Sequence, residues 1–341
     1  MTPIKKLWTE IRYWIILLLV FFVLFEMISS MILYRKYTSG KLAILHYTQH
    51  DNREFAYEPW LMFRSADRKS SSLHVNGFER LSEPSSVTVA SSKDTVDIFF
   101  FGGGSLYGKD LQDKETIPSQ FLQVYKASNP SKSLRVHNFG VPWYYSRQEL
   151  MLLTRLIFEG RKPDMVIFLD GMTDFSAARM LYYDKPYFSY ALQQTFDGKM
   201  FQKGDGHFVD TTAQLFKDPD GMDAKKFNDE LISKYINNIT QAAKLCRHEG
   251  IKSYFFCEPV PYYNYPAKES DTNIFHGSYN RFIDIYPALE TYRDTAINFH
   301  FLGNMVQNEK AGAFLNEMNY SPSLSRKIAE QIYSTVKNDL Q

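Results

Sequence analysis

The stretch Asp97-Ile-Phe-Phe-Phe101-Gly-Gly-Gly-Ser105-Leu-Tyr-Gly108 decides the fold of this chain. Its first half is a short apolar run, as expected for a strand buried in a sheet. The three glycines permit a tight turn from a strand into a helix, and such a turn exposes Ser105 with its backbone N–H. The segment therefore predicts a strand, a turn and a helix, with a serine at the turn.

Short apolar runs and helical patterns alternate from this stretch to the C-terminus. Buried strands that alternate with helices predict a three-layer α/β/α domain with a mostly parallel central sheet. Residues 175–222, rich in Tyr, Phe, Gly and Asp, interrupt the alternation and are predicted to be an insertion at the active edge of the sheet. Further strands are expected at 134–138, 164–169, 252–257 and 296–301, and helices at 116–128, 146–160, 224–249, 278–292 and 322–339.

Near the N-terminus, residues 13–34 form an apolar run of 22 residues with one formal charge, Glu26. About 20 apolar residues in a helix cross a hydrocarbon core. The run is too long for the apolar part of a signal peptide, and no small-residue cleavage site follows it. It therefore predicts a transmembrane anchor. A carboxyl near the middle of a membrane is costly unless it is neutral or paired, so Glu26 either contacts a partner helix or is neutral near the far interface.

The basic residues on the two sides of this run are nearly balanced, and the free N-terminus favours an N-in orientation. Residues 1–12 are then cytoplasmic, 13–34 span the inner membrane, 35–92 form a linker and an irregular lead-in, and 93–341 form an extracytoplasmic domain.

Composition limits the function classes. The net charge of +1 gives no reason to expect nucleic acid as a partner. No CxxC motif or His/Cys cluster suggests a metal, and no cofactor is expected. The two cysteines, Cys246 and Cys257, are either a single disulfide or two separate thiols.

Polar blocks follow the predicted strands, where ligands of open α/β sheets bind. They read Asn138-Phe-Gly140 after the second strand, Asp170-Gly-Met-Thr173-Asp174 after the third, and Phe314-Leu-Asn316-Glu-Met-Asn319-Tyr-Ser-Pro322 near the C-terminus. Together with Gly-Gly-Ser105-Leu, these blocks resemble the SGNH, or GDSL-type, hydrolase family over residues 95–338. The segment Leu73–Arg80 is similar to the lead-in of membrane-anchored bacterial members. The resemblance implies a flavodoxin-like α/β/α fold.

The resemblance also implies roles for individual residues. Ser105 matches the family's nucleophile, and its N–H and that of Gly140 match oxyanion-hole donors. Thr173 stands where the family has an oxyanion asparagine. Asn316 and Asn319 stand where the family has the catalytic Asp and His, so the acid and the base are both missing. A serine hydroxyl is a poor nucleophile without a base, and losing a triad base costs on the order of 10⁶ in turnover.

A substitute base is the remaining route to catalysis. His137 ends the second strand and His207 lies in the insertion, while Asp174 and Glu317 are carboxylates close to the family blocks. Each of these residues also has a purely structural interpretation.

Three functions follow from these observations. The first is a catalytically impaired accessory or binding subunit of a cell-envelope complex, because anchored members of the family accompany membrane-bound O-acyltransferases that acetylate envelope polysaccharides. The second is an active serine esterase or O-acyltransferase on acylated envelope glycans, using Ser105 and a non-standard base. The third is a purely structural subunit of a membrane complex, held through the anchor and Glu26.

Overall fold

The computed structural model describes residues 3–36, 55–89, 95–128, 130–176, 223–266, 271, 281–294 and 296–340. The chain divides into two compact units, Met1–Asp51 and Asn52–Gln341. Most of the predicted insertion at 175–222, with His207, lies outside the described residues.

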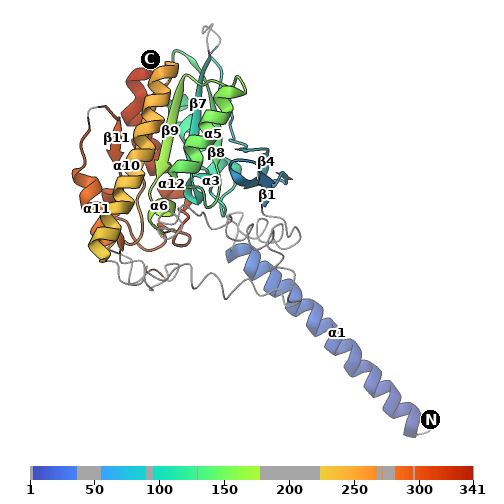
Figure 1. Cartoon of the computed structure of the whole chain (residues 1–341). Coiled ribbons are helices and arrows are strands. Elements are labelled where there is room, and N and C mark those ends of the chain that lie inside the picture. Colours follow the sequence, from blue (N-terminus) through green and yellow to red (C-terminus); the bar gives the residue numbers. More distant parts are fainter. Residues whose placement is uncertain are drawn as a thin grey trace. The chain divides into compact units, whose positions relative to one another are not determined.

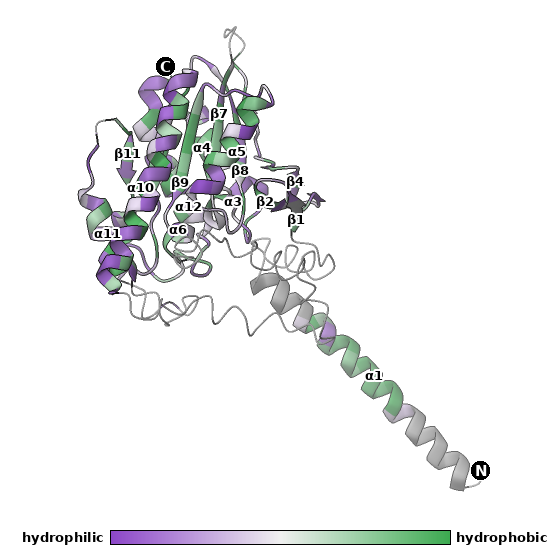
Figure 2. Ribbon diagram, in the orientation of Figure 1, coloured by the Kyte–Doolittle hydropathy of each residue, from purple (hydrophilic) through white to green (hydrophobic). Residues whose placement is uncertain are grey.

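In the first unit, α1 spans Pro3–Lys36 and contains the whole apolar run. The described side chains between Tyr13 and Ile28 include a long series of exposed apolar groups. Figure 2 colours most of this part of the ribbon green, for hydrophobic residues. Among the described residues, however, no helix reaches the combination of length and apolar character that crossing a membrane requires. The transmembrane anchor at 13–34 therefore gains no support from the structure.

The second unit is built on a nine-stranded sheet with the order β11-β10-β9-β7-β8-β5-β4-β3, to which β6 adds by pairing with β8. Five neighbouring strands, which include the edge strand β11, are parallel, as predicted (Figure 1): β7 (Thr95–Gly102), β8 (Ser133–Gly140), β9 (Met165–Asp170), β10 (Lys252–Cys257) and β11 (Phe299–Phe301). All six residues of β9 are buried, as expected for a parallel strand covered on both faces.

Helices pair on the faces of this sheet (Figure 1). Helix α5 (Ser146–Phe158) packs against α10 (Ala224–Glu249), and α4 (Ile117–Ala127) packs against α12 (Pro322–Val336). Helix α11 (Arg281–Thr291) contacts α10, and the short helices α3 (Gly104–Tyr107) and α6 (Met172–Ser176) follow β7 and β9. The predicted α/β architecture is confirmed.

The lead-in differs from the prediction, because residues 55–87 form six short strands rather than an irregular segment. Strands β1 (Phe55–Glu58) and β2 (Met62–Ser65) form a separate antiparallel pair. Four others join the main sheet antiparallel to their neighbours, which makes the sheet mixed: β3 (Arg68–Lys69), β4 (His74–Asn76), β5 (Glu79–Arg80) and β6 (Ser86–Val87). Strands of two to four residues are too short for alternation to be visible in the sequence.

The open question about the cysteines is settled, because Cys246 and Cys257 are both free and buried. Cys246 lies on α10 and Cys257 ends β10. Burial raises the pKa of the Cys246 thiol to about 12, so it stays protonated and packs as a small apolar group.

Candidate functional site

Ser105 lies in the first turn of α3, directly after β7, as the glycines predict. The backbone of this turn is tightly enclosed. A Cβ at Gly102 would lie 2.7 Å from the carbonyl oxygen of Leu169, and a Cβ at Gly103 would lie 2.7 Å from Oγ1 of Thr173. Glycine is therefore needed here for close approach, and the turn brings Ser105 and Thr173 to the same edge of the sheet.

The hydroxyl of Ser105 donates a hydrogen bond to Oε2 of Glu258. Tyr320 donates its hydroxyl to the same oxygen at 2.7 Å, and the backbone N–H of Met172 donates to Oε1 at 2.7 Å. The residues Ser105, Glu258 and Tyr320 are each at most 4% exposed. The group nearest to the serine hydroxyl is thus a buried carboxyl.

Glu258 was not among the residues selected from the sequence. It follows the last residue of β10, in the same relation to its strand as the other polar blocks have to theirs. The rule that ligand-binding residues follow the carboxyl ends of strands could have identified it, because Cys257-Glu258-Pro259 places a charge at such an end. The family blocks contain no residue of this strand or of the segment directly after it, so the resemblance gave no reason to select Glu258.

Burial raises the pKa of Glu258 above its ordinary value, and the hydrogen bonds from Ser105, Met172 and Tyr320 oppose that shift. Three further buried carboxyls surround the same region: Glu149, Asp170 and Asp174. Burial is also the main cause that raises the pKa of each of these, and their mutual repulsion adds to it. The site is therefore a cluster of buried carboxyls whose protonated forms are favoured.

Asn316 and Asn319 are brought together, but their amides bind a different carboxylate. Nδ2 of Asn316 donates to Oδ2 of Asp110 at 2.7 Å, and Nδ2 of Asn319 donates to the same oxygen at 3.3 Å and to Oδ1 of Asn316 at 3.0 Å. Asp110 lies five residues after Ser105. The positions that resemble an acid and a base thus form an amide pair that holds the loop after α3.

A substitution tests this arrangement. Replacing Asn316 by aspartate puts a second carboxylate against Asp110 and removes a charge-assisted hydrogen bond, so we expect a loss of about 2 kcal/mol in unfolding free energy at pH 7. The loss should shrink near pH 4, where one carboxyl of the pair can take up a proton. Thermal melts of the full chain at both pH values measure it.

The matched control exchanges the two groups. The double variant Asn316→Asp with Asp110→Asn restores one donor and one acceptor, and it should regain most of the stability. If the single variant at Asn316 were as stable as the parent at pH 7, the amide–carboxylate contact would not contribute to the fold.

In the structure, the backbone N–H of Gly140, which is predicted to be an oxyanion donor, has a partner within the chain. Its N–H donates to Oδ1 of Asn138 at 2.9 Å, and a Cβ at this position would lie 2.6 Å from the backbone nitrogen of Tyr107. Position 140 needs a glycine because β8 and α3 are in close contact there.

In the loop that follows, Trp143 has a φ of 70°, a strained backbone conformation for a bulky residue.

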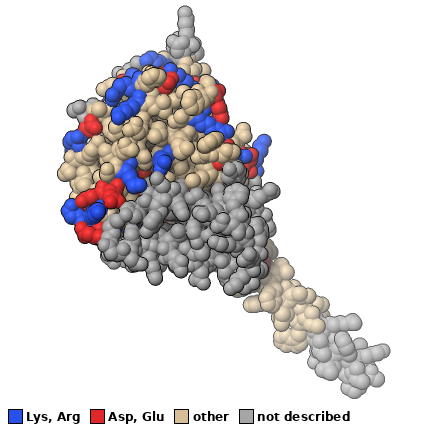
Figure 3. Space-filling view, in the orientation of Figure 1, with Lys and Arg blue, Asp and Glu red and all other residues tan. Residues whose placement is uncertain are grey.

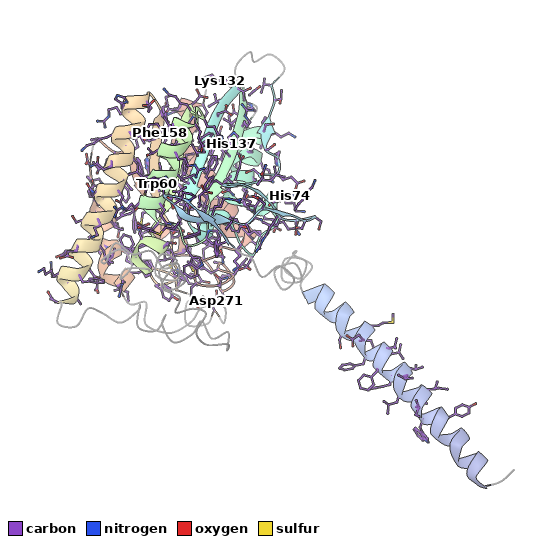
Figure 4. The ribbon with its side chains drawn as sticks, turned by 45° about the vertical axis from the view of Figure 1, so that its right-hand side comes forward. Trp60, His74, Lys132, His137, Phe158 and Asp271 are labelled. Carbon is purple, nitrogen blue, oxygen red and sulfur yellow. The ribbon has the colours of Figure 1, made fainter. Side chains whose placement is uncertain are left out.

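Asp174 and His137, the other pocket candidates, have partners of their own. Asp174 accepts the hydroxyl of Ser146 at 2.5 Å and its backbone N–H at 3.3 Å, at the start of α5. His137 lies on β8, with Nδ1 2.8 Å from Glu79 (Figure 4). His137 thus belongs to an ion-pair cluster on the sheet, and the structure does not bring it to Ser105.

A separate cavity of about 430 Å³ lies at the opposite ends of the strands, with Val96, Met165 and Lys252 among its lining residues.

The face of the molecule in Figure 3 carries both basic and acidic side chains. In the part of the chain that the structure describes, no group of three His, Cys, Asp or Glu side chains is arranged to hold a metal ion.

This site lies on an α/β protein with a mixed, mainly parallel sheet. No protein-family model matches the chain, and no curated protein matches it. Solved structures similar to it include the psychrotrophic esterase EstA from Pseudoalteromonas sp. (14% identity, 72% of this chain, 98% of that chain, TM-score 0.36). A carbohydrate acetylesterase family member from Sinorhizobium meliloti (10% identity, 72% and 99%, TM-score 0.42) and the acetyl xylan esterase AlAXEase (13% identity, 71% and 100%, TM-score 0.42) are also similar.

Proposed function

We propose that the chain is an SGNH-hydrolase-like protein with degenerate catalytic residues, which acts as an accessory or binding subunit of a cell-envelope complex. The observation that carries this proposal is the amide pair Asn316 and Asn319, hydrogen-bonded to Asp110 at the positions that resemble the catalytic acid and base. A side-chain amide cannot take up a proton near neutral pH. The occupied N–H of Gly140 further weakens the resemblance to a working oxyanion hole.

The proposal includes the location of the protein. Residues 13–34 anchor it as a single span in the inner membrane, with the N-terminus in the cytoplasm and the main unit extracytoplasmic. The support for this part is the amino-acid sequence of the run. The proposed partner is a membrane-bound O-acyltransferase that acetylates an envelope polysaccharide, with Glu26 at the contact between the two proteins and a glycan as ligand of the main unit.

Purification of the full chain in mild detergent tests the accessory role. We expect a membrane-bound O-acyltransferase, identified by mass spectrometry, to copurify in a stoichiometric amount. The variant Glu26→Leu should lower its recovery at least tenfold, because it removes the polar contact in the anchor. The neighbouring Met27→Leu serves as the control and should leave recovery unchanged. A monomeric, unpartnered protein would contradict the proposal.

One observation favours a second function. The hydrogen bond from Ser105 to Glu258 supplies the serine with a proton acceptor that the family blocks lack. An active serine esterase or O-acyltransferase on acylated envelope glycans is therefore the second candidate. Turnover of a chromogenic acetyl ester by the full chain, and its loss in Ser105→Ala, would support it. Equal rates in the two proteins would exclude it.

A further inference from the structure

The contact between Ser105 and Glu258 has the geometry of a nucleophile and its base. A general base must lie within hydrogen-bonding reach of the proton that it removes. The hydroxyl of Ser105 donates to Oε2 of Glu258, from the turn at the end of β7 to the residue after β10. These two strands are separated in the sheet only by β9, so the sheet itself holds the two residues at a fixed spacing.

Glu258 is also held firmly in orientation. The backbone N–H of Met172 fixes Oε1, while the single hydroxyl proton of Tyr320 is shared between Oε2 at 2.7 Å and the carbonyl of Pro259 at 2.9 Å. Tyr286 donates its hydroxyl to the carbonyl of Glu258 itself at 2.9 Å. A carboxyl that is held through both oxygens and its backbone presents one defined acceptor to Ser105.

The surroundings make this carboxyl a stronger base than an exposed one. Burial raises the pKa of Glu258, and a carboxylate with a raised pKa accepts a proton more readily. The titratable groups that face it are all acids, and the charge of Glu258 raises the pKa of each: Asp170 on β9, Asp174 on α6, Glu149 on α5, Cys257 on β10, Tyr286 on α11 and Tyr320 before α12. Of these groups, Tyr320 donates a hydrogen bond that favours the ionised form of Glu258.

We infer that Glu258 is the general base that activates Ser105 for acyl transfer, an inference that rests on the second function proposed above. In the first step, Oγ of Ser105 bonds to the carbonyl carbon of an ester while its proton passes to Oε2 of Glu258. In the second step, the bond from that carbon to the alcohol oxygen breaks, and Glu258 returns the proton to the leaving alcohol. Water, or a glycan hydroxyl, then takes the acyl group by the same two proton transfers in reverse.

The rate at which a fluorophosphonate labels Ser105 in the full chain tests the inference, because labelling needs only the first of these proton transfers. We expect the labelling of the parent protein to rise with pH as Glu258 loses its proton, and to vanish in Ser105→Ala. The variant Glu258→Gln should label about 10²-fold more slowly and without this pH dependence. The matched control is Glu290→Gln, since Glu290 also accepts a tyrosine hydroxyl, from Tyr263 at 2.8 Å.

The variant Tyr320→Phe adds an independent readout that does not remove the base. The hydrogen bond from Tyr320 lowers the pKa of Glu258, so its loss should move the rise in labelling to higher pH. Equal labelling rates in the parent and Glu258→Gln would overturn the assignment of the base while leaving the second function in place. If Ser105 of the parent protein took no label, the second function and the inference would both fail.

Discussion

Replacing Arg80 by methionine is expected to lower the free energy of unfolding by about 3–5 kcal/mol. The side chain of Arg80 has no exposed surface. Its Nε donates to Asp113 at 2.9 Å, and its other nitrogens donate to the carbonyls of Tyr107, Gly108 and Leu111. Removing the guanidinium takes a donor from each of these four buried acceptors, although Asp113 still accepts from the N–H of His74 and the carbonyl of Gly108 from the N–H of Leu111.

The position of Arg80 explains why this loss should matter beyond stability. The three carbonyls belong to the end of α3 and the loop after it, so Arg80 joins the lead-in strand β5 to the turn that carries Ser105. Thermal melts should show a fall of about 10 °C in Tm. Arg135→Met is the control, because Arg135 makes an exposed ion pair with Asp97 and such pairs are worth less than about 1 kcal/mol. A fall in Arg80→Met no larger than the control's would show that this network does not stabilise the unit.

The second large expected effect is a loss of stability as pH rises. Burial raises the pKa of Asp174 from 3.8 to about 7. A carboxyl whose pKa is higher in the folded protein stabilises the fold fully below its unfolded pKa, and this contribution is lost as pH rises through the folded pKa. Asp174 alone should therefore remove about 4 kcal/mol of stability between pH 4 and pH 8. Glu149, Asp170 and Glu258 shift in the same direction.

Denaturant titrations of the full chain from pH 4 to pH 8 measure this dependence. In Asp174→Asn the amide oxygen can still accept from Ser146, but the group no longer titrates, so the decline with pH should shrink by about 4 kcal/mol. Asp229→Asn, at an exposed carboxylate paired with Lys225, should keep the full decline. A parent protein equally stable at both ends of this range would contradict the raised pKa values.

The sequence was most informative where periodicity and glycines act locally. The strands β7, β8, β9 and β10 and the long helices between them are visible as apolar runs and helical patterns, because each is long enough for its burial to set its composition. The fifth parallel strand, β11, has only three residues, and its pattern is correspondingly weak. The turn at Ser105 was equally visible, since only glycine tolerates the contacts that Gly102 and Gly103 make. The short strands of the lead-in were not, because their pairing with β8 depends on residues far away in the chain.

The sequence by itself determined that Ser105 stands at a strand end without the expected histidine, because these facts depend only on residue identity and local pattern. Which groups face that serine was decided by the tertiary structure. Glu258 is 153 positions away from Ser105, and only the parallel order of β7, β9 and β10 brings the two together. The same is true of Asp110, which accepts hydrogen bonds from the side-chain amides of Asn316 and Asn319. Hydrogen-bond partners of buried groups are chosen by distance and direction in space, and neither is encoded in any short segment of the chain.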